Sequence, residues 1–210
     1  MPTLYQLKPK FQQALRPVLN ALHRAGISAN FVTLLALCAS VLLGVVLWIW
    51  PAARWLWLLL PPFLLLRMAL NAIDGMLARE FNQQSRLGAI LNEAGDVISD
   101  CALYAPFALL SGVHAGLLAL VVFLATLTEF TGVLGQLIHG GRRYDGPVGK
   151  SDRAFVFGAL ALLHGMNWLP PMLWNPVLGL LALLLLLTVF NRIRQALRVA
   201  AQAEEQGASC

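Results

Sequence analysis

Long apolar blocks separated by short polar segments dominate the chain. We delimit six of them, at residues 31–50, 53–78, 87–111, 115–139, 153–169 and 173–192. Each is close to the roughly 20 residues with which a helix crosses a hydrocarbon core about 30 Å thick. The blocks lack the alternating pattern of barrel strands, so only helices satisfy their backbone groups inside a bilayer. The pattern predicts an all-α integral membrane protein with six transmembrane helices.

The segment before the first block is amphipathic. Its apolar residues fall on one helical stripe, which comprises Leu4, Leu7, Phe11, Leu15, Val18 and Leu22. Together with the basic residues around it, this stripe predicts an N-terminal interfacial helix within residues 1–25 that interacts with membrane lipids. Pro9 and Pro17 are expected to break or bend this helix. An N-terminal arm that packs on the rest of the domain is the alternative.

Composition agrees with a fold whose solvent is lipid. Hydrophobic residues make up 59% of the 210 residues and charged residues 12%, and the mean hydropathy is +0.71, outside the usual balance of soluble domains. Because no internal repeat or second soluble segment is evident, we predict a single domain over residues 1–210, with a six-helix bundle at 26–198 and a polar tail at 199–210. Cys38, Cys101 and Cys210 have neither disulfide nor zinc spacing and are expected to be unpaired.

Basic residues gather at alternate ends of the blocks. Before the first block and after the second, fourth and sixth stand Lys8, Lys10, Arg16, Arg24, Arg79, Arg86, Arg142, Arg143, Lys150, Arg192, Arg194 and Arg198. Because basic loops stay on the cytoplasmic side, we expect both termini and the site described next to face the cytoplasm, as in a bacterial inner membrane. Anionic lipid headgroups account for the net charge of +5, so no nucleic-acid partner is needed.

Ionisable and amide side chains interrupt the second and third blocks, where such groups are costly and usually functional. On the second block, steps of three and four residues place the polar or small residues of one helical face at Arg67, Asn71, Asp74 and Ala78. On the third block, polar or small residues recur at every fourth position, at Gly88, Asn92, Asp96 and Asp100. The short link between the blocks is expected to fold the third helix against the second. Two facing stripes rich in oxygen atoms suit Mg²⁺ or Mn²⁺, which neutralise a pyrophosphate during phosphoryl transfer.

The stretch NAIDGMLAREFNQQSRLGAILNEAGD, residues 71–96, resembles the signature D-x2-D-G-x2-A-R-x8-G-x3-D-x3-D of the CDP-alcohol phosphotransferase (CDP-alcohol phosphatidyltransferase) family. Asn71 and Asn92 stand at the first and third aspartates of the signature, and the matching positions are Asp74, Gly75, Ala78, Arg79, Gly88 and Asp96. Residues 26–30 are similar to the family's Gly-Ile-Thr-Pro-Asn segment, with alanine for proline. A shift of the acidic pair by one turn, to Asp96 and Asp100, is the alternative register, but it breaks the Gly88 spacing.

The resemblance implies a membrane enzyme of phospholipid synthesis. It implies transfer of a phosphatidyl or similar lipid-phosphate group from a CDP-linked lipid, with CDP-diacylglycerol as the expected donor, to an acceptor alcohol such as a polyol phosphate. CMP is then released. The implied cofactors are two Mg²⁺ or Mn²⁺ ions, and the implied assembly is a homodimer.

The resemblance also implies roles for single residues. Asp74 and Asp96 are catalytic, Asp96 takes the hydroxyl proton, and the metal-ligand positions are Asn71, Asp74, Asn92 and Asp96. The nucleotide-binding positions are Gly75, Ala78, Arg79 and Gly88. Asn30 and Thr33 either cap the first span or contact the nucleotide, and we favour capping. Two amides in place of carboxylates remove negative charge and are expected to weaken cation binding. Glu93 and Asp100 are candidates to offset this loss of negative charge.

Several charged groups have open roles. Arg67 and Asp100 lie at similar depth, at about 1.5 Å per residue, and we favour a buried ion pair over a substrate contact. Glu129 either joins that network or lines the cavity, and Arg192 is expected to end the last span at the interface. The segment with Arg142, Arg143, Lys150 and Arg153 is expected to form either a phosphate-binding pocket or a solvated basic loop. The alternative functions are a catalytically impaired relative that acts as a nucleotide- or lipid-binding or regulatory subunit, and a small transporter.

Overall fold

The computed structural model describes residues 4–138 and 141–207, and its regular structure is helical. The helices are α1 (Leu4–Arg24), α2 (Ala29–Ile49), α3 (Arg54–Trp57), α4 (Leu60–Glu80), α5 (Arg86–Tyr104), α6 (Ala115–Leu137), α7 (Lys150–Gly165) and α8 (Trp174–Gly207), with 3₁₀ turns at Ala105–Leu109 and Pro171–Leu173. No strand occurs in these two ranges. The prediction of an all-α fold is therefore confirmed.

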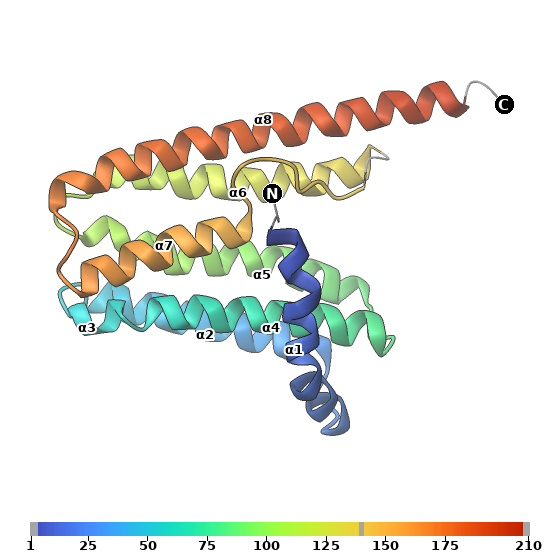
Figure 1. Cartoon of the computed structure of the whole chain (residues 1–210), viewed down its shortest axis with the longest axis horizontal. Coiled ribbons are helices and arrows are strands. Elements are labelled where there is room, and N and C mark those ends of the chain that lie inside the picture. Colours follow the sequence, from blue (N-terminus) through green and yellow to red (C-terminus); the bar gives the residue numbers. More distant parts are fainter. Residues whose placement is uncertain (1–3, 139–140, 208–210) are drawn as a thin grey trace.

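Six long helices of the described chain form one bundle, and α1 crosses one end of it (Figure 1). α2 packs along both α4 and α5, α4 packs on α7, and α6 packs on α8. α8 continues past its neighbours through Gly207, so most of the segment that we predicted as a polar tail is the end of a helix. Each apolar block of the sequence contains one long helix.

Within the described chain, four helical stretches are long and apolar enough to cross a membrane: Ala29–Ile49, Arg54–Glu80, Ala115–Leu137 and Pro171–Gln202. α7 has only 16 residues and α5 contains several charged residues, so the count of six spans stays a prediction. Large apolar side chains on the outside are strongly exposed, such as Leu65 at 68% and Phe155 at 77%. Exposure of this kind marks a lipid-facing surface, and the protein is an integral membrane protein.

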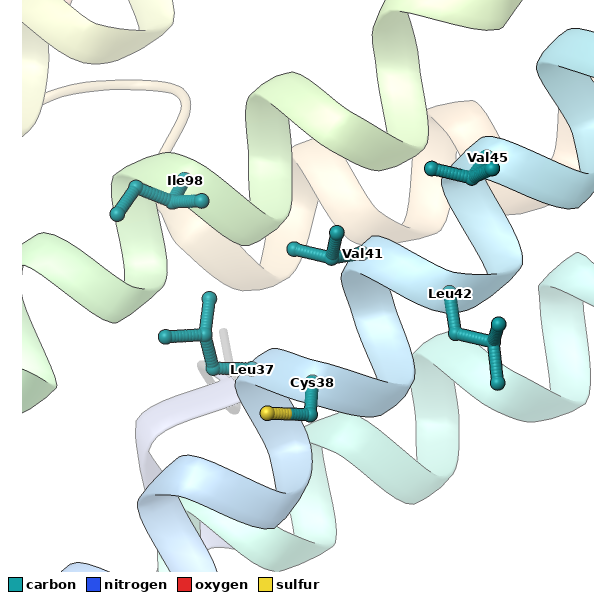
Figure 2. Close-up of a pocket in the computed structure, with 6 residues that line it drawn as sticks. All are labelled: Leu37, Cys38, Val41, Leu42, Val45 and Ile98. Atoms are coloured by element: carbon teal, nitrogen blue, oxygen red, sulfur yellow. The ribbon is translucent and has the colours of Figure 1, made fainter.

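An apolar hollow on the outer surface lies between α2 and α5 (Figure 2). It measures about 460 Å³ and is lined by Leu37, Cys38, Val41, Leu42, Val45 and Ile98. With no charged group in its lining, the hollow offers space for a lipid chain but no chemistry. Cys38 and Cys101 are unpaired, as their spacing predicts, whereas Cys210 lies outside the described residues.

α1 is a continuous helix, although Pro9 and Pro17 lie inside it. The expectation of a break is therefore wrong. A proline removes one backbone hydrogen bond, and the packing of α1 on α4 compensates: Leu19 is fully buried in that contact, and His23 stacks on Phe81 with ring centroids 3.8 Å apart. α1 packs on the domain, as our alternative states, and its location in the membrane interface stays a prediction.

α2 approaches the end of α5 closely at Gly44, where a Cβ atom would lie 2.3 Å from the carbonyl oxygen of Ala102. A backbone oxygen cannot move aside as a flexible side chain can. Gly44→Ala is therefore expected to lower the free energy of unfolding by about 1–3 kcal/mol. Gly179→Ala is the matched control, because nothing lies within 4 Å of a Cβ atom there. Thermal unfolding in detergent measures both variants, and equal midpoints would contradict the close packing at Gly44.

Candidate active site

The polar residues of α4 and α5 meet at one end of the bundle, where residues 81–85 connect the two helices. Asn82 has a positive φ of 54°, a conformation that asparagine tolerates, and Ser85 caps α5 by accepting a hydrogen bond of 2.9 Å from the Gly88 amide. α5 packs along α2, however, and makes few direct contacts with α4. Our expectation that the third helix folds against the second is wrong for the backbone, and the two polar stripes are connected through side chains, Arg67 and Asn71 on α4 with Asp100 and Asp96 on α5.

Asp96 on α5 accepts contacts from two other helices. Its Oδ1 accepts a hydrogen bond of 3.1 Å from Asn71 Nδ2 and lies 3.5 Å from Arg67 Nη2, both on α4. The same oxygen forms an ion pair with Lys150, the first residue of α7. Arg67 also donates to the backbone carbonyl of Asp96 over 3.0 Å. The structure therefore brings Asn71, Asp96 and Lys150 together.

Asp74 is the second carboxylate of the site, and it is only 5% exposed. Its Oδ2 accepts a hydrogen bond of 2.8 Å from Thr33 Oγ1 on α2, and it lies three residues after Asn71, the α4 residue that contacts Asp96. Thr33 thus orients Asp74, a role that sequence reasoning missed. The one available signal was a hydroxyl side chain in the first turns of an apolar span.

The start of α2 corrects another expectation. Ser28 has the extended backbone of an N-cap and accepts a hydrogen bond from a first-turn amide, so the capping that we favoured for Asn30 and Thr33 is wrong. Both lie inside the helix, past the capping position. Asn30 Nδ2 instead donates to Ser85 Oγ over 3.4 Å. The missing side chain of Gly88 leaves room for Asn30, whose Oδ1 would lie 2.6 Å from a Cβ atom there.

Gly75, Ala78 and Arg79 form an accessible edge of α4 at this end. Arg79 is exposed and Ala78 is partly exposed. The Arg79 guanidinium lies over Gly75, where a Cβ atom would be 3.1 Å from Nη1. Asn92 lies one turn before Asp96 on α5 and is partly exposed. A ligand can therefore reach this edge and Asn92 from outside the protein.

Deeper in the bundle, a network of ion pairs joins α4, α5, α6 and α7. Arg67 Nη1 lies 2.5 Å from Asp100 Oδ1, which is the ion pair that their similar depth predicts. Arg153 Nη2 lies 2.9 Å from both Asp100 Oδ2 and Glu129 Oε1, and Arg153 also donates to Thr128 Oγ1 over 3.1 Å. Of the two roles left open for Glu129, the structure shows membership of this network.

The basic residues before α7 fold onto the protein, which is not the arrangement of a solvated loop. Arg142 pairs with Glu129 at 3.0 Å and also with Glu93, and burial lowers the pKa of its guanidinium. Arg143 donates to a backbone carbonyl of α8 over 3.3 Å. Glu93 and Asp100 both form ion pairs with arginines, and the hypothesis that they offset the missing carboxylates stays a prediction.

Arg192 on α8 points into the bundle, whereas we expected it at the membrane interface. It is 2% exposed and lies 3.9 Å from Glu129 Oε1, and it donates to the Thr128 carbonyl. Gly132 leaves the space that Arg192 fills, because a Cβ atom there would lie 3.0 Å from Arg192 Nη1. A glycine three residues after an intramembrane glutamate was the signal that could have revealed this partner.

Asp74 and Asp96, with the amide oxygens of Asn71 and Asn92, are the groups that can hold a divalent cation. Hard cations take oxygen ligands of these kinds. No metal-binding group of three or more histidine, cysteine, aspartate or glutamate side chains occurs in the part of the chain that the structure describes. Asp96 is itself paired with Lys150 and lies 3.5 Å from Arg67, and the number of two ions stays a prediction.

Known proteins resemble this chain in sequence. The profile of the CDP-alcohol phosphatidyltransferase family matches residues 27–143. Inner membrane protein YnbA of Escherichia coli (strain K12) is 53% identical over 203 residues, which cover 95% of this chain and 99% of YnbA. Phosphatidylinositol phosphate synthase of Streptomyces avermitilis is 30% identical over 210 residues, which cover 93% of this chain and 84% of that protein.

Two crystal structures of Mycobacterium tuberculosis phosphatidylinositol phosphate synthase (PgsA1) have a similar fold. The structure with CDP-DAG bound has a TM-score of 0.71 at 21% identity, covering 86% of this chain and 92% of that one. The structure in complex with manganese and citrate has the same TM-score and identity, and the match covers 86% of this chain and 87% of that one. At this identity the likeness establishes the fold of the chain.

Proposed function

The chain belongs to the CDP-alcohol phosphatidyltransferase family, and on that premise we propose that it transfers a lipid-phosphate group from CDP-diacylglycerol to an acceptor alcohol and releases CMP. Family membership supports transferase activity in general, and the donor and acceptor are part of the proposal. The observation that carries it is the meeting of Asn71, Asp96 and Lys150, with Asp74 on the same face of α4, beside the accessible edge of that helix.

Two features of the structure support a CDP-linked lipid as donor. Ala78 presents a small side chain on the accessible edge of α4, where a cytidine would fit, and the exposed Arg79, whose guanidinium lies over Gly75, would supply positive charge for its phosphates. An apolar groove of about 680 Å³ between α4 and α7 reaches Ser151, next to Lys150, and is lined mainly by Pro61, Leu64, Leu65, Met68, Phe155 and Leu162. The lining of the groove is mainly apolar, as acyl chains require. The headgroup and the acyl chains of the donor lipid would therefore bind to neighbouring parts of α4.

The proposed reaction is a displacement at the lipid-bearing phosphorus. The acceptor oxygen forms a bond to that phosphorus, the bond to the CMP phosphate breaks, and Asp96 takes the hydroxyl proton. Asn71 and Lys150 hold the Asp96 carboxylate in one orientation, and Thr33 does the same for Asp74. A divalent cation held by these carboxylates would neutralise the pyrophosphate and the charge that develops on CMP.

The acceptor class that we propose is a polyol phosphate. Arg142 and Arg153 are already neutralised by carboxylates. Arg143, by contrast, donates to a backbone carbonyl and makes only a long contact of 3.8 Å with Asp145. Arg143 is therefore the arginine of this group with the most charge left for a phosphate of the acceptor.

Arg143→Gln is expected to raise the KM for a phosphorylated acceptor about tenfold or more, because a hydrogen bond to a charged group is worth about 1.5–3 kcal/mol. The KM for CDP-diacylglycerol should stay unchanged. CMP release at varied concentrations of each substrate gives both constants. Arg194→Gln, on an exposed position of α8, is the matched control. The same acceptor KM in the two variants would remove Arg143 from the acceptor site.

The proposed function is tested by a screen of acceptor alcohols with the purified full chain in detergent. CDP-diacylglycerol and Mn²⁺ or Mg²⁺ are supplied, and CMP release is measured with glycerol, inositol, their phosphates and serine. We expect CMP release that depends on both the metal and the acceptor, with a polyol phosphate as the best substrate. Absence of CMP release with every acceptor would contradict the transferase.

A binding or regulatory subunit without turnover is the second candidate function. Neutral amides at two of the four signature aspartates favour it, since Asn71 and Asn92 lower the negative charge available to a metal. The double substitution Asn71→Asp with Asn92→Asp discriminates between the two functions. Release of CMP only in the double variant supports the subunit, whereas release by the unsubstituted chain supports the enzyme.

For location and assembly, we propose a homodimer in a bacterial inner membrane with the site and both termini on the cytoplasmic side. YnbA is named an inner membrane protein, and the site lies at the end where basic residues gather, as the positive-inside rule requires. Labelling of a cysteine introduced at exposed Arg194, from either side of sealed vesicles, tests the orientation. Labelling only from the periplasmic side would contradict it.

A further inference from the structure

We propose that the site binds one divalent cation per chain and that the ammonium of Lys150 supplies the second positive charge, against Asp96. This inference deepens the proposed function, because it concerns the cation that would neutralise the donor's pyrophosphate. It departs from the two ions that the family resemblance implies. Three observations carry it: the contact of Asn71 with Asp96, the contact of Lys150 with Asp96, and the balance of charge in the bundle.

Asn71 stands at a signature aspartate position, yet its nitrogen faces Asp96. Asn71 Nδ2 donates to Asp96 Oδ1 over 3.1 Å. Two carboxylates at this distance would repel each other unless a proton or a cation lay between them. An amide and a carboxylate attract each other directly, so the exchange removes the need for an ion at this point.

Lys150 brings a fixed positive charge to the same oxygen of Asp96. The N-terminus of α7 sets its position, because the Gly149 amide donates to Asp152 Oδ2 over 2.8 Å and so fixes the first turn of the helix. With Asn71, Lys150 and Arg67 all directed at Oδ1, the other carboxylate oxygen of Asp96 keeps two lone pairs, one for the acceptor hydroxyl and one for a metal ion that Asp74 would also bind.

The side chains that join the ion pairs of Asp96 and of the network, together with Asp74, balance in charge without a metal, and the exposed Arg79 is outside this count. Five of them are positive and five are negative: Arg67, Arg142, Lys150, Arg153 and Arg192 against Asp74, Glu93, Asp96, Asp100 and Glu129. The pyrophosphate of a CDP-linked lipid adds roughly two negative charges, which one divalent cation neutralises. A second divalent ion would leave the buried site with excess positive charge, which is costly in a low dielectric.

The count of bound ions is measured by titrating Mn²⁺ into the purified full chain with CDP-diacylglycerol but without an acceptor, with electron paramagnetic resonance as the readout and the same lipid micelles without protein as the blank. We expect one Mn²⁺ per chain, with the resolved hyperfine lines of an isolated ion. Two ions per chain with a spin-coupled spectrum would overturn the proposal. CMP release is not part of this measurement: one bound ion without turnover contradicts only the proposed function, and turnover with two bound ions contradicts only this inference.

Substitution of Lys150 tests the second half of the proposal. Lys150→Met removes a positive charge beside the cation and is expected to tighten Mn²⁺ binding about tenfold or more. Arg194→Met, an exposed position of α8, removes the same charge far from the site and should leave the Kd unchanged. Adding Asn71→Asp and Asn92→Asp to Lys150→Met should create a second Mn²⁺ site. Equal Kd values for Lys150→Met and Arg194→Met would overturn the role of Lys150.

Discussion

Asp96→Asn is expected to lower the rate of CMP release by about 10²–10⁴-fold, the usual contribution of a general base. The substitution removes the group that would accept the hydroxyl proton, and it removes one of the two carboxylates available to a metal. The bundle should stay folded, because Arg67 keeps its ion pair of 2.5 Å with Asp100. CMP release from CDP-diacylglycerol and the thermal midpoint in detergent measure the two effects separately.

Glu80→Gln is the matched control for Asp96→Asn. Glu80 ends α4 and makes only an exposed ion pair of 3.4 Å with Arg16, which contributes little to stability. The same change from carboxylate to amide at this position should leave CMP release and the thermal midpoint unchanged. Undiminished release in Asp96→Asn, with Glu80→Gln also active, would contradict the catalytic role of Asp96 and with it the proposed reaction.

Arg153→Met is expected to lower the free energy of unfolding by about 3–5 kcal/mol, as loss of one partner from a buried ion network does. Arg153 is 1% exposed and contacts both Asp100 and Glu129 at 2.9 Å. Methionine fills much of the same volume but leaves these two carboxylates less compensated among α5, α6 and α7. The loss of stability would therefore arise from unpaired charge and not from a cavity.

The stability of Arg153→Met is measured by titrating the purified protein in mixed micelles with sodium dodecyl sulfate and following helical circular dichroism. Arg194→Met serves as the control, because Arg194 lies on an exposed position of the same bundle. A midpoint equal to that of the control would show that the network is not needed for folding. Arg153 would then be better explained as a substrate contact.

Patterns along single helices predicted much of this protein. The length of each apolar block predicted a long helix in each, and spacing placed Asn71 and Asp74 on one face of α4 and Asn92 and Asp96 on one face of α5. Equal depth along two helices predicted the ion pair between Arg67 and Asp100. These features depend on local quantities, helical rise and residue polarity, which a sequence contains directly.

Contacts between distant segments were predicted less well. The sequence placed α5 on α4, but α2 packs along both helices and the polar stripes of α4 and α5 meet through their side chains. It offered Asn30 and Thr33 as caps, yet Ser28 caps α2 and Thr33 binds Asp74. Such errors have one physical cause: several partners of the right type exist for each polar group, and the packing of helices selects among them.

By itself, the sequence determined the membrane environment, the helical content, the family signature over residues 71–96 and the amides at two of its aspartate positions. Only the tertiary structure decided what those amides mean. It showed that Lys150 forms an ion pair with Asp96 and that Glu93 and Asp100 form ion pairs with arginines. The reason is that hydropathy and spacing act within one helix, whereas the charge around a buried carboxylate is the sum over every helix packed beside it.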